Sequence, residues 1–270
     1  IEVRGAKQDI WWDAMTKNDT IRIQYANKYA GSSNYWKNSM GMNEALANLG
    51  VLPEKEQLET RLNDWIQSNP VNTAKYGTTL GTLAESYGNS GDLALYTTYF
   101  LEVFKNGIEL IRFANTILQF NTNATEEEKQ AFINDRFIES YKNYVPALDR
   151  KVLPVLMKLY ADRVPARYYP DIYQTIDEKF GGDYEKYADW LFANTQFTSL
   201  DTLLELLKSA DSKLLMEDPA MVLALSTTDM GYELSEQMMP SYEQIVKGER
   251  EFMAALMEMD SKKTFYPDAN

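Results

Sequence analysis

A serine in a Gly-Asn-Ser-Gly setting, Ser90, is the most conspicuous candidate nucleophile in this sequence. A serine hydroxyl is a poor nucleophile unless a base within hydrogen-bond reach takes its proton, and the chain contains no His and no Cys. The nearest lysines, Lys75 and Lys105, are each 15 residues away. We therefore interpret residues 88–91 as a helix end and turn, because glycine is the usual helix terminator. The missing residue types also exclude Ser-His-Asp catalysis, Cys nucleophiles and thiolate metal sites.

Pairs of acidic residues are a second source of chemistry, because two carboxylates can divide the work of general acid and base. In a helix, Asp9 and Asp13 would lie one turn apart, and Glu251 and Glu258 two turns apart. With 40 acidic residues in the chain, solvated helix faces explain such spacings. The sequence contains no calcium-binding loop pattern and no Glu-x-x-His pair, so it predicts neither a metal site nor a cofactor.

The stretch from residue 24 to residue 46 combines large aromatic side chains with amides and hydroxyls. Its notable members are Tyr25, Tyr29, Tyr35, Trp36, Ser32, Ser33, Asn34 and Asn38. Core packing is the ordinary role of the aromatic residues. An asparagine at a cavity wall can instead offer its carbonyl oxygen to a ligand ammonium. Within the stretch, Gly31-Ser32-Ser33 predicts a helix end followed by a new N-cap.

The charge balance limits the partners of the chain. There are 27 basic and 40 acidic residues among 270, for a formal net charge of −13. A phosphate backbone or an anionic lipid surface repels such a protein, so we expect neither nucleic acid nor a membrane as partner. No apolar run reaches the roughly 18 residues that a membrane-spanning helix needs. The hydrophobic fraction of 44% is enough for a sizeable core.

Helical periodicity predicts the elements that position these groups. Between residues 126 and 162 apolar side chains recur in steps of three and four, as one helical stripe requires. These residues are Ile133, Phe137, Tyr141, Tyr144, Leu148, Val152, Val155 and Leu159. Thr125 and Glu128 have the spacing of a capping box. Pro146 and Pro154 predict kinks or abutting helices, because each removes an interior hydrogen bond.

The same periodicity recurs over most of the chain, whereas alternating strand patterns are rare. Helices are predicted over 53–67, 93–120 with a break near Gly107, 183–193, 200–209, 219–239 and 241–259. Helix stops are predicted at Gly181-Gly182, Pro219 and Pro240. The sequence therefore predicts an all-α, irregular multi-helical domain of about ten helices.

The two ends of the chain suggest that it is part of a longer polypeptide. It begins at Ile1 without a signal-like apolar segment and ends in a turn-prone tail, residues 265–270. We expect both ends to be cuts made inside that polypeptide.

Four stretches resemble the helical domain of the bacterial serine dipeptidyl-peptidases 7 and 11 from Bacteroidetes. They are Tyr25 to Asn43, Asn106 to Ala114, Phe252 to Met259 and Phe265 to Asn270. They run in order from near the start of the chain to its last residue, so the resemblance covers almost the whole chain. The first stretch, with Ser32-Ser33-Asn34-Tyr35-Trp36-Lys37-Asn38, and the last, with Tyr266-Pro267-Asp268-Ala269-Asn270, are the most specific.

The resemblance implies a division of labour between this chain and a missing part. The family's serine, histidine and aspartate lie on a chymotrypsin-like double β-barrel, and a large helical insert covers the cleft. Residues 1–264 would form that substrate-capping domain, and residues 265–270 would begin the linker returning to the catalytic barrel of the same polypeptide. The parent protein would be a serine dipeptidyl-peptidase of the periplasm or cell surface of a Gram-negative bacterium. The family also suggests a homodimer.

The family's chemistry assigns a role to the asparagines of residues 24–46. An enzyme that releases dipeptides must hold the free α-ammonium of an oligopeptide at a fixed distance from the scissile bond, and a desolvated ammonium has three donors to satisfy. The resemblance implies that Asn34 is one acceptor, with Asn38, one turn further on, as the alternative. Tyr35 and Trp36 are candidates for the cleft wall, although both could equally pack in the core.

Two other functions are compatible with the residues. A free-standing helical binding or scaffold protein of the cell envelope would need no catalytic group at all. A stand-alone hydrolase could use two of the many carboxylates, but no pair is singled out by its position. A reading frame that continues into β-rich sequence with a Gly-Asn-Ser-Gly motif would favour the peptidase.

Overall fold

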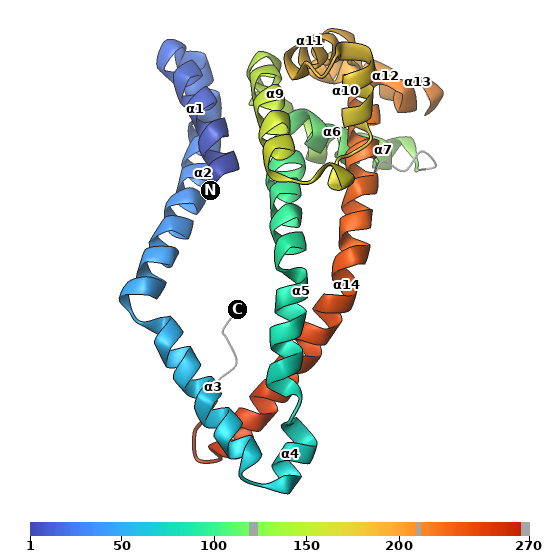
Figure 1. Cartoon of the computed structure of the whole chain (residues 1–270). Helices are drawn as coiled ribbons and strands as arrows, with labels where there is room; N and C mark the ends of the chain where they lie inside the picture. Colours follow the sequence, from blue (N-terminus) through green and yellow to red (C-terminus); the bar gives the residue numbers. More distant parts are fainter. Residues whose placement is uncertain (119–123, 209–211, 266–270) are drawn as a thin grey trace. The chain divides into compact units, whose positions relative to one another are not determined.

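The computed structural model describes residues 1–118, 124–208 and 212–265, and every regular element among them is a helix (Figure 1). The all-α, multi-helical prediction is confirmed. The described residues form two compact units. The first unit comprises the described residues within 1–39 and 96–234, and the second comprises those within 40–95 and 235–265.

Three long helices contribute residues to both units: α2 (Asp19–Asn48), α5 (Thr79–Phe100) and α14 (Pro219–Met259). The second unit also contains α3 (Val51–Gln67) and α4 (Pro70–Tyr76). The α-helices that belong to the first unit alone are α1 (Glu2–Lys17), α6 (Glu109–Ile117), α7 (Glu126–Ile133), α8 (Glu139–Lys142), α9 (Pro146–Arg163), α10 (Ile172–Phe180), α11 (Tyr184–Asn194), α12 (Leu200–Lys208) and α13 (Ser212–Glu217). Two π-helical segments, η1 (Leu101–Lys105) and η2 (Asn134–Ile138), and two 3₁₀ turns, η3 (Ala166–Tyr168) and η4 (Gln196–Thr198), complete the first unit.

Helix α9 is the centre of the first unit, where it packs against α11 and α1. Pro146 occupies its first turn, where the missing proline N–H costs no hydrogen bond. Leu148, Val152, Leu156 and Tyr160 follow at intervals of four and are almost wholly buried. The apolar stripe predicted for residues 126–162 is largely buried from Ile133 to Val152 and is divided among several helices. Its end is wrong, because Val155 is 38% exposed and the buried face of α9 continues through Leu156 and Tyr160. Pro154 lies inside α9.

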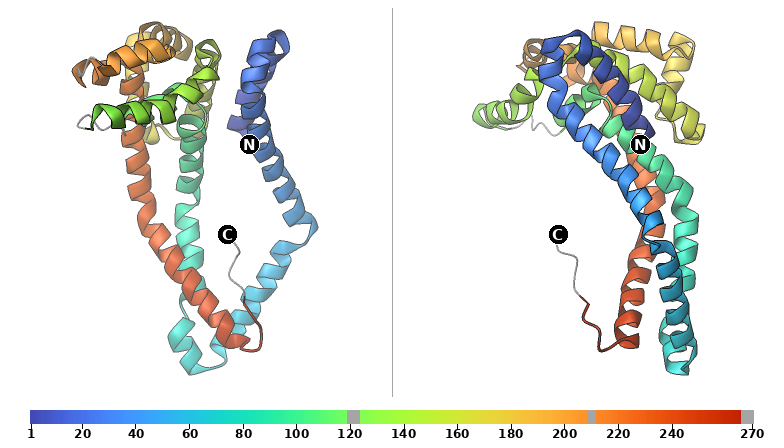
Figure 2. Two further views of the ribbon diagram at one scale, coloured as in Figure 1. Left: turned by 180° about the vertical axis from the view of Figure 1, so that it is seen from behind. Right: turned by 90° about the vertical axis from the view of Figure 1, so that its left-hand side faces the viewer.

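Helices α1 and α2 form an antiparallel pair joined at Asn18 (Figure 2). The Asn18 Oδ1 atom accepts hydrogen bonds from the backbone N–H of Thr20 at 2.9 Å and of Ile21 at 3.1 Å. The side chain therefore satisfies two of the free amides at the start of α2. The predicted capping box of α7 is also confirmed, with both Thr125 and Glu128 hydrogen-bonded as the motif requires.

The prediction of a helix end at Gly31-Ser32-Ser33 is wrong, because α2 continues through these residues to Asn48. The Ser32 hydroxyl accepts a hydrogen bond from Gln8 Nε2 on α1 at 3.0 Å, so it bonds another helix in place of capping its own. A glycine inside a helix costs only about 1 kcal/mol. Packing of α2 against α1 can outweigh that cost.

Residues 88–91 likewise lie inside α5 and form neither a helix end nor a turn. The Ser90 hydroxyl is buried and donates to the Ser86 carbonyl oxygen at 2.8 Å. It therefore has a local backbone partner and no base. The stop predicted at Pro240 is also wrong, because α14 continues through it. The surroundings of Pro240 are exposed, so water can bond the carbonyl that this proline leaves without a partner. The stop at Gly181-Gly182 is confirmed, and both residues have positive φ.

The second unit has its own small core. Leu62 and Ile66 of α3, Tyr76 of α4, and Ala255 and Leu256 of α14 are buried together. The terminal motif from Tyr266 to Asn270 lies outside the described residues.

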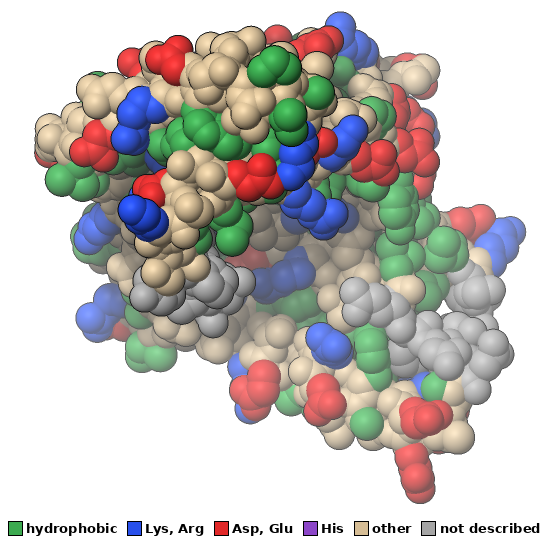
Figure 3. All heavy atoms as spheres, turned by 90° about the horizontal axis from the view of Figure 1, so that it is seen from below, with side chains coloured by type: hydrophobic (Ala, Val, Ile, Leu, Met, Phe, Trp, Pro, Cys, Tyr) green, Lys and Arg blue, Asp and Glu red, His purple; other side chains and the backbone are tan. Residues whose placement is uncertain are grey.

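Charged side chains of both signs are interspersed on the face shown in Figure 3. None of the described helices is long and apolar enough to cross a membrane.

Candidate functional site

The first half of α2 contacts the other helices of the first unit along one stripe of residues. Its members, Tyr25, Lys28, Ser32 and Tyr35, are spaced by three and four residues and so share a helix face. Tyr25 is fully buried and meets the Trp11 ring edge-on at 5.3 Å. Tyr35 lies beneath the guanidinium of Arg4, with 4.8 Å between Arg4 Cζ and the ring centroid. Each successive turn of α2 from Tyr25 to Tyr35 therefore has a partner in the first unit.

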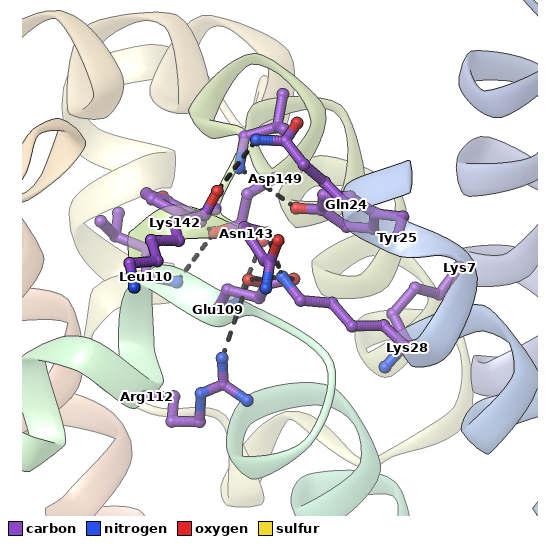
Figure 4. Close-up of polar contacts among 12 residues, drawn as sticks. Lys7, Gln24, Tyr25, Lys28, Glu109, Leu110, Arg112, Lys142, Asn143 and Asp149 are labelled. Carbon is purple, nitrogen blue, oxygen red and sulfur yellow. Dashed lines mark hydrogen bonds and ion pairs between the residues drawn. The ribbon is translucent and has the colours of Figure 1, made fainter. Parts of the chain in front are cut away.

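A partly buried ion pair forms the middle of this attachment (Figure 4). The Lys28 Nζ atom lies 2.9 Å and 2.7 Å from the two carboxylate oxygens of Glu109, at the start of α6. Lys28 also donates to the Asn143 carbonyl oxygen at 2.5 Å. The side chain of Glu109 is 9% exposed, and Arg112 approaches it at 3.7 Å. Burial lowers the pKa of Lys28, while Glu109 acts in the opposite direction.

Asp149 of α9 caps the same end of α6 from inside the core. Its two carboxylate oxygens accept the backbone N–H groups of Glu109 at 3.0 Å and Leu110 at 2.8 Å. The Tyr144 hydroxyl donates to it at 3.3 Å. Burial and the neighbouring Glu109 carboxylate raise the pKa of Asp149. A helix N-terminus favours an anionic cap, so Asp149 fixes the helix that in turn holds Lys28.

Helix α1 completes the frame with two basic side chains. Lys7 is buried and donates to the Asn106 carbonyl oxygen at 2.8 Å, and burial lowers the pKa of Lys7 to about 8. Arg4 forms two hydrogen bonds with the Glu102 carboxylate, at 2.6 Å and 2.7 Å. Since Glu102 lies on η1, this bidentate pair links η1 through Arg4 to Tyr35 of α2.

Asn34 lies on the side of α2 opposite the attached stripe. With a rotation of about 100° per residue, its side chain points away from the direction of Ser32 and Lys28. Asn34 is exposed, and its side chain makes no hydrogen bond to any residue that the structure describes. The amide oxygen of Asn34 is therefore available to an external donor, on a helix whose opposite face is fixed.

The other predicted site residues also lie on α2. Asn38 is exposed one turn after Asn34. Tyr35 is 65% exposed despite its contact with Arg4, whereas Trp36 is half-buried. The structure thus brings the four residues together on one stretch of helix, with two amides, one exposed ring and one partly packed ring.

The four residues offer hydrogen-bond acceptors and an aromatic ring to an external group. Within the described ranges no group of three or more metal-ligating side chains converges. The exposed amide of Asn34 offers acceptor lone pairs and two N–H donors.

Residues 1–270 match the peptidase S46 family along their whole length. The chain belongs to the peptidase S46 family. Among its relatives in the family, dipeptidyl-peptidase 7 of Porphyromonas gingivalis is 40% identical over 276 residues, and dipeptidyl-peptidase 7 of Porphyromonas endodontalis is 37% identical over 276 residues. These matches cover 100% of this chain but only 38% and 33% of the two relatives.

The helical fold of this peptidase S46 chain also occurs in a solved structure. The crystal structure of Porphyromonas endodontalis DPP11 in complex with the dipeptide Arg-Glu matches with a TM-score of 0.82 and 24% sequence identity. The match covers 100% of this chain and 39% of that one. The resemblance to the serine dipeptidyl-peptidases is confirmed at the level of family and fold.

The residues that position α2 could not be assigned from the sequence. Glu109 was visible only as an acidic residue after the break at Gly107, and Arg4 and Glu102 are 98 residues apart. The one available signal is the spacing of Tyr25, Lys28, Ser32 and Tyr35, which identifies the attached face of α2 but none of its partners.

Proposed function

We propose that this chain is the substrate-capping helical part of a serine dipeptidyl-peptidase that releases dipeptides from the free N-terminus of oligopeptides. In this proposal the nucleophile, base and acid lie in the part of the polypeptide that the chain does not span. Its lack of histidine and its coverage of 38% of the P. gingivalis relative support this division. The relatives' names and the dipeptide bound to the DPP11 structure support the substrate class.

The proposal depends on one observation, the unpaired and exposed amide of Asn34 on an anchored helix. We assign Asn34 Oδ1 as one acceptor for the substrate α-ammonium. An ammonium removed from water must replace its hydrogen bonds, and a rigid acceptor does so without first losing side-chain and backbone freedom. Tyr35, exposed beside Asn34, would form part of the wall around the first substrate residues.

The test replaces Asn34 in the complete polypeptide and measures hydrolysis of a dipeptidyl substrate with a free amine. Asn34→Ala should lower kcat/KM. The corresponding loss of transition-state stabilisation should be about 1–3 kcal/mol, the cost of removing one hydrogen-bond partner from a charged group. Asn34→Asp, which keeps an acceptor oxygen, should retain more activity. Asn27→Ala is the matched control, because Asn27 is exposed on the same face of α2 two turns earlier.

Three outcomes decide the assignment. A loss confined to Asn34→Ala supports it. A loss in Asn38→Ala with none in Asn34→Ala would move the acceptor one turn along α2. If neither variant changes kcat/KM, α2 does not bind the amine and the proposal fails.

A further inference from the structure

The link from η1 through α1 to α2 lies next to the proposed amine acceptor. Glu102 holds Arg4 with two hydrogen bonds of 2.6 Å and 2.7 Å, and both side chains are largely shielded, at 20% and 22% exposure. The Arg4 guanidinium in turn lies 4.8 Å from the centroid of the Tyr35 ring. Tyr35 is the residue directly after Asn34.

The attachment of α2 depends on this link at its outer end. Three anchors, Tyr25, Lys28 and Ser32, precede Asn34 along the helix, and Tyr35 is the only member of the stripe that follows it. On the far side of Asn34, the Arg4 contact with Tyr35 stands beside the half-buried ring of Trp36 as a support of the helix. Beyond Trp36, residues 37–48 of α2 are all exposed, so no buried side chain among them supports this part of the helix.

Geometry explains why arginine is suited to this position. A planar guanidinium can bind a carboxylate with two parallel hydrogen bonds and still present its face to an aromatic ring. The hydrogen bonds to Glu102 fix the orientation of the Arg4 guanidinium. The guanidinium in turn contacts the Tyr35 ring and so holds that face of α2 in place. The pair is thus connected to Asn34 through one ring and one peptide unit.

We propose that Arg4, oriented by Glu102, is a positioning residue that fixes the Asn34 amide for the substrate α-ammonium. This inference rests on the proposed function of Asn34 but makes a separate claim, because Arg4 acts through Asn34 without touching substrate. A displacement of about 1 Å at a binding group can reduce catalysis by up to about a hundredfold.

A double-mutant cycle in the complete polypeptide separates positioning from general stabilisation. Arg4→Met alone should lower kcat/KM for a free-amine dipeptidyl substrate about fivefold to tenfold. In the Asn34→Ala background the same change should cost less than about twofold, because the group that Arg4 positions is already absent. Glu102→Gln, which keeps the side-chain volume but removes the charge, should give a smaller loss of the same kind and serves if Arg4→Met does not fold.

The matched control is Arg150→Met, which breaks an ion pair between α9 and α11 with Asp189 in the same unit. It should leave kcat/KM within about twofold of the wild type in both backgrounds.

Each result of the cycle has one meaning. A loss of kcat/KM on Arg4→Met that disappears in the Asn34→Ala background supports the positioning role of Arg4. Equal losses in both backgrounds, or a loss matched by Arg150→Met, would show a general structural effect and overturn the inference while leaving Asn34 as the acceptor. If Asn34→Ala itself has no effect, Asn34 is not the acceptor, and the inference about Arg4 fails with that assignment.

Discussion

Replacing Asp149 tests the frame that holds α2 most sharply. The Asp149 side chain accepts two backbone N–H groups at the start of α6, and the residue is only 3% exposed. In Asp149→Ala these two donors lose their partner at a place that water reaches poorly. An unsatisfied buried donor costs about 1–3 kcal/mol, so two should cost about 2–6 kcal/mol.

One effect opposes this loss of stability, so we expect a value in the lower half of the range of about 2–6 kcal/mol. Burial and repulsion from Glu109 raise the pKa of Asp149, which means that its ionised form is disfavoured in the folded chain. Removing the carboxylate relieves that repulsion. We therefore expect the free energy of unfolding to fall by about 2–4 kcal/mol at neutral pH, a large part of the stability of a typical domain.

The matched control is Asp183→Ala in the same unit. The Asp183 carboxylate accepts the backbone N–H groups of Glu185 and Lys186, both at 3.0 Å, at the start of α11. Its side chain is 38% exposed, so water can replace the lost cap. Urea unfolding followed by circular dichroism should show a clearly larger shift of the midpoint for Asp149→Ala than for Asp183→Ala. Equal shifts would refute the reasoning that burial makes the Asp149 cap important.

Two further predictions concern the buried lysine and the division of labour. Burial lowers the pKa of Lys7 from 10.5 to about 8, so between these values the unfolded chain binds more protons and stability should rise with pH, by at most about 1.4 kcal/mol per unit. Urea unfolding between about pH 7.5 and 9, where most tyrosines of the unfolded chain are still protonated, should show stability rising with pH more steeply in the wild type than in Lys7→Met; the same slope in both would exclude Lys7 as its origin. The purified 270-residue chain should leave dipeptidyl substrates uncleaved in a fluorogenic assay, because it contains no histidine to serve as base; turnover that copurifies with the chain would contradict the proposed location of the catalytic residues.

Local signals in the sequence predicted the elements whose ends depend on local chemistry. The cap at Thr125, the new helix at Pro146 and the left-handed end at Gly181 each follow from the conformational limits of one or two residues. The same rules failed at Gly31 and Gly88, where α2 and α5 continue through glycine. A helix-breaking tendency of about 1 kcal/mol is decisive only where no packing opposes it.

The candidate site divides in the same way. The position of Asn34 within a distinctive run of residues could be selected from the sequence, and helical spacing correctly groups it with Asn38. Its supports could not be predicted, because the pairs Lys28–Glu109 and Arg4–Glu102 join residues 81 and 98 positions apart. Such pairs depend on how helices pack, and periodicity along one helix carries no information about its partner.

The most direct test of the central claim is a crystal structure of the complete polypeptide with a dipeptide bound. We predict that the ligand α-nitrogen lies within hydrogen-bond distance of Asn34 Oδ1, about 2.7–3.2 Å, with the Arg4 to Tyr35 contact intact beside it. A dipeptide whose α-nitrogen is held entirely by other groups, with the Asn34 amide still facing solvent, would contradict the account.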